Sequence, residues 1–295
     1  MNGRLLLIDA NSIIHRAFHA LPPFTSSSGE PTGALYGLAS ALLKLIKEQR
    51  PAYAAAFFDR PEPTFRDKLY ADYKAHRPPT AETLIPQIQE APNLFAQFSI
   101  HSFSEAGFEA DDLIGTFAER FKKTPGITVV VLSGDQDLLQ LVENDKVLLA
   151  YMRKGISDFT LYNEESATQK LGLPPLLLPD YKGLAGDPSD NIPGVTGIGS
   201  KTARELLGAY GSIEKIFAHI KELSPALERK LEGKKDQALM SKNLATIHRM
   251  ATMPHIRLAD LTLRPLDETI LVPYFTHLGF HSLTRRLYTN SNTLL

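Results

Sequence analysis

Three short apolar runs, each followed by an aspartate, constrain the fold of this chain most strongly. The runs are residues 5–8 before Asp9, 54–58 before Asp59, and 129–132, which Ser133 and Gly134 separate from Asp135. Such runs are typical of strands buried on both faces of a parallel sheet. Segments between them, such as 35–47 and 111–121, have helical periodicity. The sequence therefore predicts an α/β fold with a mostly parallel central sheet flanked by helices.

Two further regions differ in pattern from this core. Residues 60–92 are polar and proline-marked, with basic and aromatic side chains, and predict a mobile helical insertion. Beyond about residue 172 the strand signals end, and short helical patterns with Gly and Pro turns take over. We therefore expect an α/β core over residues 1–172, a helical region over 173–288 and a tail over 289–295.

Composition restricts the class of protein. With 43% hydrophobic and 22% charged residues, the chain is expected to be an ordinary globular protein and a monomer. Only eight residues precede Asp9, too few for a signal peptide or a membrane span, so we expect a cytoplasmic protein that binds no membrane. Cysteine is absent, so any metal must be bound by oxygen or imidazole.

Nine acidic residues follow predicted strands or lie near the starts of predicted helices. They are Asp9, Asp59, Glu109, Asp111, Asp112, Asp135, Asp137, Asp187 and Asp190. Taken singly, each could be a turn or N-cap residue. Taken together, carboxylates gathered at one sheet edge repel one another unless cations balance them. The pattern favours two divalent ions about 4 Å apart, with Mg²⁺ expected and Mn²⁺ as a substitute.

The charge balance and the missing motifs agree with a metal-dependent enzyme acting on nucleic acid. The net charge is −1, but with the nine acids assigned to metal, 32 basic residues face 24 acidic ones, a balance of +8 that suits a phosphate-rich partner. The sequence has no Gly-x-Ser-x-Gly elbow, no phosphate-binding Walker loop and no His-Glu-x-x-His. The single histidines, His15, His19, His76 and His101, are interpreted as surface or core residues.

Two segments carry candidate DNA contacts. Residues 194–203 hold three glycines, Gly194, Gly197 and Gly199, and lead through Lys201 and Thr202 into a helical pattern. Backbone N–H groups and a helix N-terminus there could hold a DNA phosphate without reading sequence, and the alternative is a tight turn between helices.

In the insertion, three neighbouring residues could contact a DNA strand. Tyr73 could stack on a base, and Lys74 and Arg77 could meet phosphates, while the alternative is a solvated basic helix face.

Seven ordered motifs give a resemblance that covers nearly the whole chain. They are 7–9 with 16–21, 31–37, 58–59, 73–77, 109–112, 134–137 and 186–191. On these motifs the chain resembles the 5′ nuclease domain of bacterial DNA polymerase I and, more distantly, flap endonucleases.

The resemblance implies a PIN-like 5′ nuclease fold with a helical arch at about 60–92. It also implies a C-terminal helix-hairpin-helix region, with K⁺ bound at the turn around Gly197 and Gly199. The nine acids match the family's metal ligands, and Lys74 and Arg77 match the basic residues that contact the scissile phosphate. Arg16 and Arg66 are further expected DNA contacts.

We therefore expect a structure-specific 5′-3′ exonuclease and flap endonuclease that hydrolyses DNA at 5′ ends, flaps and nicks by a two-metal mechanism. Its expected setting is Okazaki fragment processing and repair in the bacterial nucleoid, with a DNA polymerase and a ligase as partners. The alternatives are a branched-DNA-binding protein that does not cut, and a related metal-dependent ribonuclease. The chain is either a free-standing enzyme or a domain of a polymerase.

Overall fold

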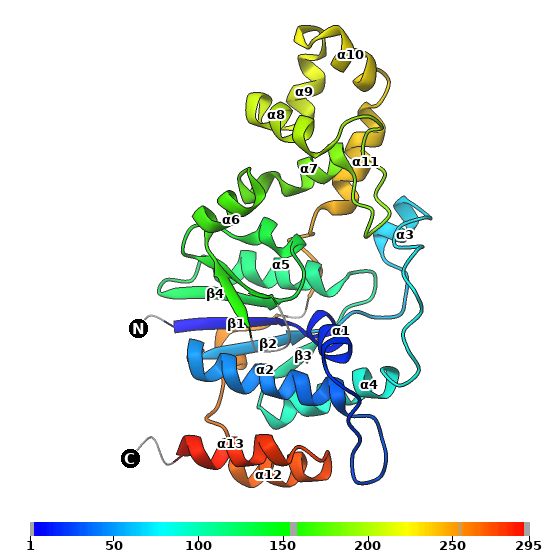
Figure 1. The fold of residues 1–295 in the computed structure, drawn as a ribbon. Coiled ribbons are helices and arrows are strands. Elements are labelled where there is room, and N and C mark those ends of the chain that lie inside the picture. Colours follow the sequence, from blue (N-terminus) through cyan, green and yellow to red (C-terminus); the bar gives the residue numbers. More distant parts are fainter. Residues whose placement is uncertain (1–2, 154–157, 254, 292–295) are drawn as a thin grey trace.

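The computed structural model describes residues 3–153, 158–253 and 255–291, so the predicted tail beyond residue 291 lies outside the described residues (Figure 1). Its centre is a six-stranded sheet in the order β3-β2-β1-β4-β5-β6. The strands are β1 (Gly3–Asp9), β2 (Tyr53–Phe57), β3 (His101–Phe103), β4 (Ile127–Ser133), β5 (Val147–Met152) and β6 (Phe159–Tyr162). All neighbours pair in parallel except β5 and β6. The predicted, mostly parallel sheet is confirmed.

Strand β1 lies at the middle of the sheet and is apolar on both sides. Leu6 and Ile8 belong to one buried cluster and Leu5 and Leu7 to another, because side chains alternate between the two faces of a strand. The chain extends the sheet from β1 first through β2 and β3, and then on the other side through β4. This reversal of strand order beside β1 produces a crevice at the carboxyl ends of the strands, where ligands of α/β folds bind.

Helices cover both faces of the sheet. The first face carries α1 (Ala10–Ala20), α2 (Gly33–Gln49), α4 (Ile85–Gln97), α12 (Glu268–His277) and α13 (His281–Ser291). The second face carries α5 (Ala110–Phe121), the 3-10 helix η1 (Asp137–Leu141), α6 (Glu164–Leu171) and the 3-10 helix η4 (Leu258–Leu261). Among the described residues, no helix is long and apolar enough to cross a bilayer.

A group of short helices, which we call the satellite, extends away from the sheet (Figure 1). After η2 (Pro175–Leu177), it comprises α7 (Leu178–Ala185), α8 (Ser200–Tyr210), α9 (Ile213–Ala218), η3 (Ile220–Glu222), α10 (Pro225–Leu231) and α11 (Lys235–Ala245). Its own core includes Leu184, Ile198, Leu207 and Ile216. The helix pair α7 and α8, joined by residues 186–199, forms the predicted helix-hairpin-helix.

The satellite is shorter than the predicted helical region over 173–288. After α11 the chain returns to the core, where Ile247 and Leu261 pack on the second face and Leu271, Phe275 and Phe280 pack on the first. Short helices look alike in sequence wherever they pack, so the pattern could not distinguish these two parts. Residues 289–291, predicted as tail, belong to α13.

The insertion predicted over 60–92 is also shorter than expected. We use the name arch segment for residues 60–84, which contain one helix, α3 (Phe65–Leu69), and a run of turns over 71–76. Residues 85–92 belong to α4, which packs on the core through Ala91, Leu94 and Phe95. Figure 1 shows α3 beside α11 of the satellite.

Candidate active site

Five of the predicted acids line one open pocket at the carboxyl ends of the strands. The pocket has a volume of about 640 Å³, and its acids are Asp9, Asp59, Glu109, Asp111 and Asp135. Asp9 ends β1 and caps α1, accepting a hydrogen bond from the Ser12 N–H at 3.1 Å. Asp59 follows β2 and accepts one from the Ala110 N–H at 2.8 Å.

The remaining acids of this pocket come from the start of α5 and the loop after β4. Glu109 caps α5 and Asp111 lies in its first turn. Asp135 follows β4 and accepts a hydrogen bond from the Asp137 N–H at 2.8 Å. Short turns thus hold acids from four separate segments at one place.

The acids of this pocket lack enough positive charge to balance them. Burial, with the nearby charges of Asp59 and Asp135, raises the pKa of Asp9 from 3.8 to about 7, although hydrogen bonds from Ser133 and Ser12 lower it. The pKa of Asp111 is raised well above its usual value by burial and by Asp9 and its other acidic neighbours. A site that penalises its own ionised carboxylates in this way is suited to a divalent cation.

A second acidic group lies on the other side of Asp135. Oxygens of Asp137, Asp187 and Asp190 fall within 4.8 Å of one another, a spacing that can hold one metal ion. The Lys182 ammonium contacts both Asp137 and Asp187. Burial still raises the pKa of Asp137 to about 6, against the lowering effect of Lys182. At Asp187 burial also raises the pKa, but Lys182 and hydrogen bonds from Ser189 together lower it below its usual value.

Two cations of the arch segment join the acidic cluster. The Lys74 ammonium lies 2.7 Å from a Glu109 oxygen, and the Arg77 guanidinium lies 2.6 Å from an Asp190 oxygen. The backbone N–H of Lys74 also donates to the Asp190 carbonyl at 3.0 Å. The structure thus places both predicted catalytic residues at the pocket. Burial lowers the pKa of Lys74, but Glu109, Tyr73 and Asp190 together raise it above its usual value.

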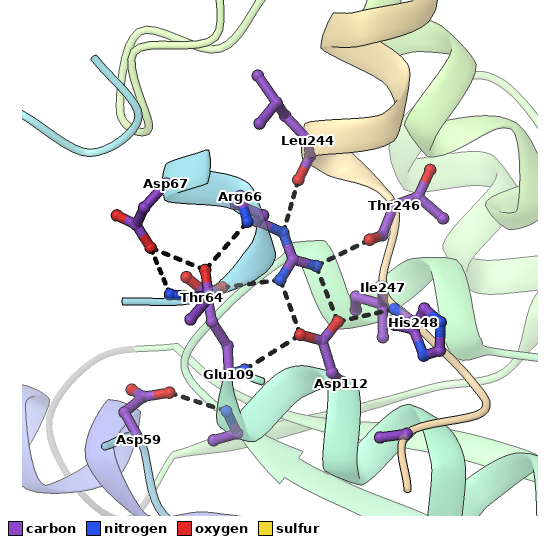
Figure 2. A network of polar contacts seen from close by, with 12 residues as sticks. Asp59, Thr64, Arg66, Asp67, Glu109, Asp112, Leu244, Thr246, Ile247 and His248 are labelled. Carbon is purple, nitrogen blue, oxygen red and sulfur yellow. Dashed lines mark hydrogen bonds and ion pairs between the residues drawn. The ribbon is translucent and has the colours of Figure 1, made fainter. Parts of the chain in front are cut away.

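Asp112 differs from the other eight acids. It is fully buried and points toward Arg66, which donates two hydrogen bonds at 2.7 and 2.8 Å (Figure 2). The N–H groups of Glu109 and His248 donate at 3.1 and 2.7 Å. Four donors fill the lone pairs of a carboxylate, so the predicted role of Asp112 as a metal ligand does not fit its surroundings.

The same contacts correct the prediction for Arg66. Only 2% of this residue is exposed, so it cannot contact DNA from the surface as predicted. Tyr73 likewise cannot stack on a base, because it is 7% exposed and packs with Ile192 and Leu244, while its hydroxyl donates to Glu109 at 3.4 Å. Both residues lie in the same polar segment as Lys74, and the sequence pattern could not show that their side chains point inward.

Three residues of the site were missed or misread from sequence. His15 and His19, interpreted as surface or core histidines, line the acidic pocket one helical turn apart on α1. Their spacing of four residues after a strand-end acid was the available signal. Lys182 carried no such signal, because its position between two acids depends on the packing of α7 against η1.

Arg16 also lines the pocket, but its guanidinium is bonded to protein. It donates to the Gly134 carbonyl at 3.0 Å and the Arg153 carbonyl at 2.9 Å, and it lies over the ring of Tyr151. It therefore supports the loop that carries Asp135.

The glycine turn between α7 and α8 has the backbone geometry that the sequence predicts. Gly194 and Gly197 have φ values of 58° and 85°, in the left-handed region that favours glycine. At Gly194 a Cβ atom would lie 2.2 Å from the Gly186 nitrogen, so no side chain fits. Gly199 caps α8 without a side chain, and Lys201 beside it is 90% exposed.

The fold and the acidic pocket together define a nuclease-type α/β protein with a helix-hairpin-helix satellite. Family models agree with this class: the 5′-3′ exonuclease N-terminal resolvase-like domain matches residues 4–172, and the 5′-3′ exonuclease C-terminal SAM fold matches residues 173–269. The chain belongs to the 5′-3′ exonuclease family and is a hydrolytic nuclease by that membership.

Curated relatives include DNA polymerase I of Bacillus subtilis, 41% identical over 285 residues, and of Caldicellulosiruptor bescii, 38% identical over 288. Each match covers 96% of this chain but only about a third of the relative, 32% and 33%. Among solved structures, the T5 5′-exonuclease with bound zinc has a TM-score of 0.67 at 20% identity, covering 83% of this chain and 90% of that one. The catalytic core of Rad2 with DNA substrate has a TM-score of 0.57 at 15% identity, covering 94% and 88%.

Proposed function

We propose that this protein is a structure-specific 5′ nuclease that cuts DNA flaps and 5′ ends with two divalent ions, Mg²⁺ foremost. The observation that carries the proposal is the pair of acidic groups at the carboxyl ends of the strands, with the raised pKa values of Asp9 and Asp111. The donors are all carboxylates, which suits Mg²⁺ or Mn²⁺. Eight acids take part, and Asp112 is left out.

Each acidic group is suited to one ion. Asp9, Glu109, Asp111 and Asp135 would hold the first, Asp137, Asp187 and Asp190 would hold the second, and Asp59 lies beside the first. Bound there, two ions would activate a water for in-line attack on a phosphodiester and stabilise the leaving oxygen.

The basic residues of the arch segment would position the scissile phosphate. Lys74 and Arg77 lie on the rim of the pocket, and Arg77 is half exposed, so both can reach a phosphate that enters from solvent. The expected products carry 5′-phosphate and 3′-hydroxyl ends.

The satellite would hold the duplex. The turn over 194–199, with Gly197 and Gly199, leads into the N-terminus of α8, where Lys201 and Thr202 lie, and backbone N–H groups at such a helix start suit phosphates. The K⁺ ion that the family resemblance implies would be held there by backbone carbonyl oxygens. A DNA role agrees with the solved relatives, which include a bacteriophage T5 flap endonuclease in complex with DNA and metal ions. Since the curated relatives are DNA polymerases I, we also propose that the nuclease works in replication and repair beside a polymerase and a ligase.

The direct test is cleavage of a 5′-labelled flap on a nicked duplex, with Mg²⁺ or with EDTA. Cutting near the branch only with Mg²⁺ is the expected result. Tight binding without cutting in Mg²⁺ would instead identify a DNA-binding protein, and equal cutting of a matched RNA flap would identify a ribonuclease.

Asp135→Ala tests the carboxylates themselves. Asp135 follows β4 at the pocket and supports no apolar core, so the variant should fold and lose cleavage. Asp145→Ala, an exposed acid before β5, is the matched control and should cut normally. Near-normal turnover by the Asp135 variant would contradict the proposed site.

A further inference from the structure

The buried guanidinium of Arg66 joins three segments that are far apart in the sequence (Figure 2). Arg66 belongs to α3 of the arch segment. Its Nη atoms donate to both oxygens of Asp112 on α5, and its Nε and Nη2 atoms donate to the carbonyls of Leu244 and Thr246 at 2.9 and 2.8 Å. One side chain therefore bonds the arch, the helix α5 and the chain that leaves α11.

Asp112 closes the network from the other side. Its oxygens also accept from the N–H of Glu109, at the start of α5, and from the N–H of His248, beyond the end of the satellite. Arg66 is 2% exposed and Asp112 is 0% exposed, so water does not compete for these bonds. The pair is a rigid link, because a bidentate Arg–carboxylate pair fixes orientation as well as distance.

The three linked segments carry or border the catalytic groups. Glu109 and Asp111 flank the helix start that Asp112 fixes. Lys74 and Arg77 follow α3 through the turns over 71–76 and bind Glu109 and Asp190. Residues 244–248 connect the satellite, the expected holder of the duplex, to the core.

Stability alone does not explain such a pair. A buried ion pair is often no more stabilising than apolar residues of the same volume, although removing one partner leaves a costly unpaired charge. Arginine is also required by the geometry, because lysine lacks the planar fork that reaches a carboxylate and two carbonyls at once.

We propose that Arg66 and Asp112 are positioning residues for the cleavage reaction. They hold the base of the arch and the end of the satellite against the start of α5, so that the cations Lys74 and Arg77 meet the acids in one fixed geometry. This role rests on the proposed nuclease function. It predicts that weakening the link slows turnover while duplex binding, which the satellite provides, is kept.

The first test replaces the fork but keeps the charge. Arg66→Lys should lower kcat on the nicked flap with Mg²⁺ by about 10- to 100-fold, because small misplacements of reacting groups have effects of this size. Its affinity for the same DNA in EDTA should stay within about two-fold of the unmodified protein. Arg60→Lys is the matched control, since Arg60 lies in the same arch segment and pairs with the exposed Glu62.

A second readout measures geometry without activity. The chain has no cysteine, so spin labels can be attached to single cysteines at two exposed positions, Lys68 on α3 and Lys123 just after α5. The distance distribution between them should be narrow in the unmodified protein and in Arg60→Lys, and clearly broader in Arg66→Lys.

A double variant separates positioning from stability. Arg66→Met with Asp112→Leu leaves no unpaired buried charge, so it should fold at least as well as Arg66→Lys. The proposal predicts slow flap cleavage and a broad spin-label distance distribution in this double variant too. A normal kcat in the double variant would overturn the positioning role, and so would unchanged spin-label distances and cleavage rate in Arg66→Lys. Failure of both variants to fold would instead show that the pair is a stability element. If the unmodified protein does not cut, the proposed function fails, and the spin-label distances still test the link.

Discussion

The metal-free protein should lose stability as pH rises, which is the reverse of the usual behaviour of paired carboxylates. The pKa of Asp9 is raised from 3.8 to about 7, and that of Asp137 from 3.8 to about 6. A carboxyl whose pKa is higher in the folded than in the unfolded state begins to destabilise the fold above its unfolded pKa. The penalty is complete once the pH exceeds the folded pKa.

The expected size follows from these values. Between about pH 5 and pH 8, ionisation of Asp9 lowers the free energy of unfolding over about two pH units, and ionisation of Asp137 over about one. Together these losses amount to about 4 kcal/mol. For a chain of this size, a change of that order lowers Tm by roughly 10 °C. Saturating Mg²⁺ should remove most of the loss, because it binds the folded state only and balances the carboxylates.

The assay is thermal unfolding across this pH range, in EDTA and in Mg²⁺. His15 acts in the opposite direction at low pH, because burial lowers its pKa, so Asp9→Asn is needed to isolate the carboxyl. That variant should show a clearly flatter pH dependence in EDTA. A Tm in EDTA that rises or stays constant up to pH 8, with no effect of Asp9→Asn, would refute the electrostatic account of the site.

Two further variants test other parts of the structure. Lys182→Met leaves Asp137 and Asp187 without their shared cation. Chemical denaturation in EDTA at pH 8 should therefore show an unfolding free energy lower by about 3 kcal/mol, which Mg²⁺ largely restores. A loss that persists in Mg²⁺ would mean that Lys182 supports the fold and not the charge balance. Gly194→Ala must place a Cβ atom against the Gly186 nitrogen at a positive φ, so the unfolding free energy should fall by at least about 2 kcal/mol. Gly208→Ala lies in an open helical position on α8 and should raise the unfolding free energy by about 1 kcal/mol. Equal effects of the two variants would contradict the close approach at Gly194.

The sheet and the first acidic group were predictable because they follow from local rules. An apolar run that ends at an acid fixes both the strand and the edge at which that acid lies, so the sequence alone predicts that Asp9, Asp59 and Asp135 lie together. The turn at Gly194 and Gly197 was predictable for the same reason, since a positive φ is a property of the backbone at that residue.

Side-chain direction inside the arch segment was not predictable in this way. Arg66, Tyr73 and Lys74 are all basic or aromatic residues in a polar stretch, yet two of them are buried and the third is bonded to Glu109. Whether such a residue points to solvent depends on which distant segment covers it, here the chain around Leu244 at the end of the satellite. The role of Asp112 was misjudged for the same reason, because its partner is Arg66 on another element.

The Lys74 ammonium should also compete with a metal ion for Glu109, and Lys74→Ala tests this competition. In the structure Lys74 neutralises Glu109 at 2.7 Å, and a charge-assisted bond of this kind contributes about 1.5–3 kcal/mol. A divalent ion that takes Glu109 as a ligand must first displace this ammonium, so removing it should tighten metal binding by about ten-fold or more. The released ammonium is then free for a phosphate, so the same variant should cut more slowly while binding duplex almost as before. Calorimetry of Mn²⁺ binding and flap cleavage should thus move in opposite directions for Lys74→Ala, and parallel losses of metal affinity and turnover would show that Lys74 only supports the site.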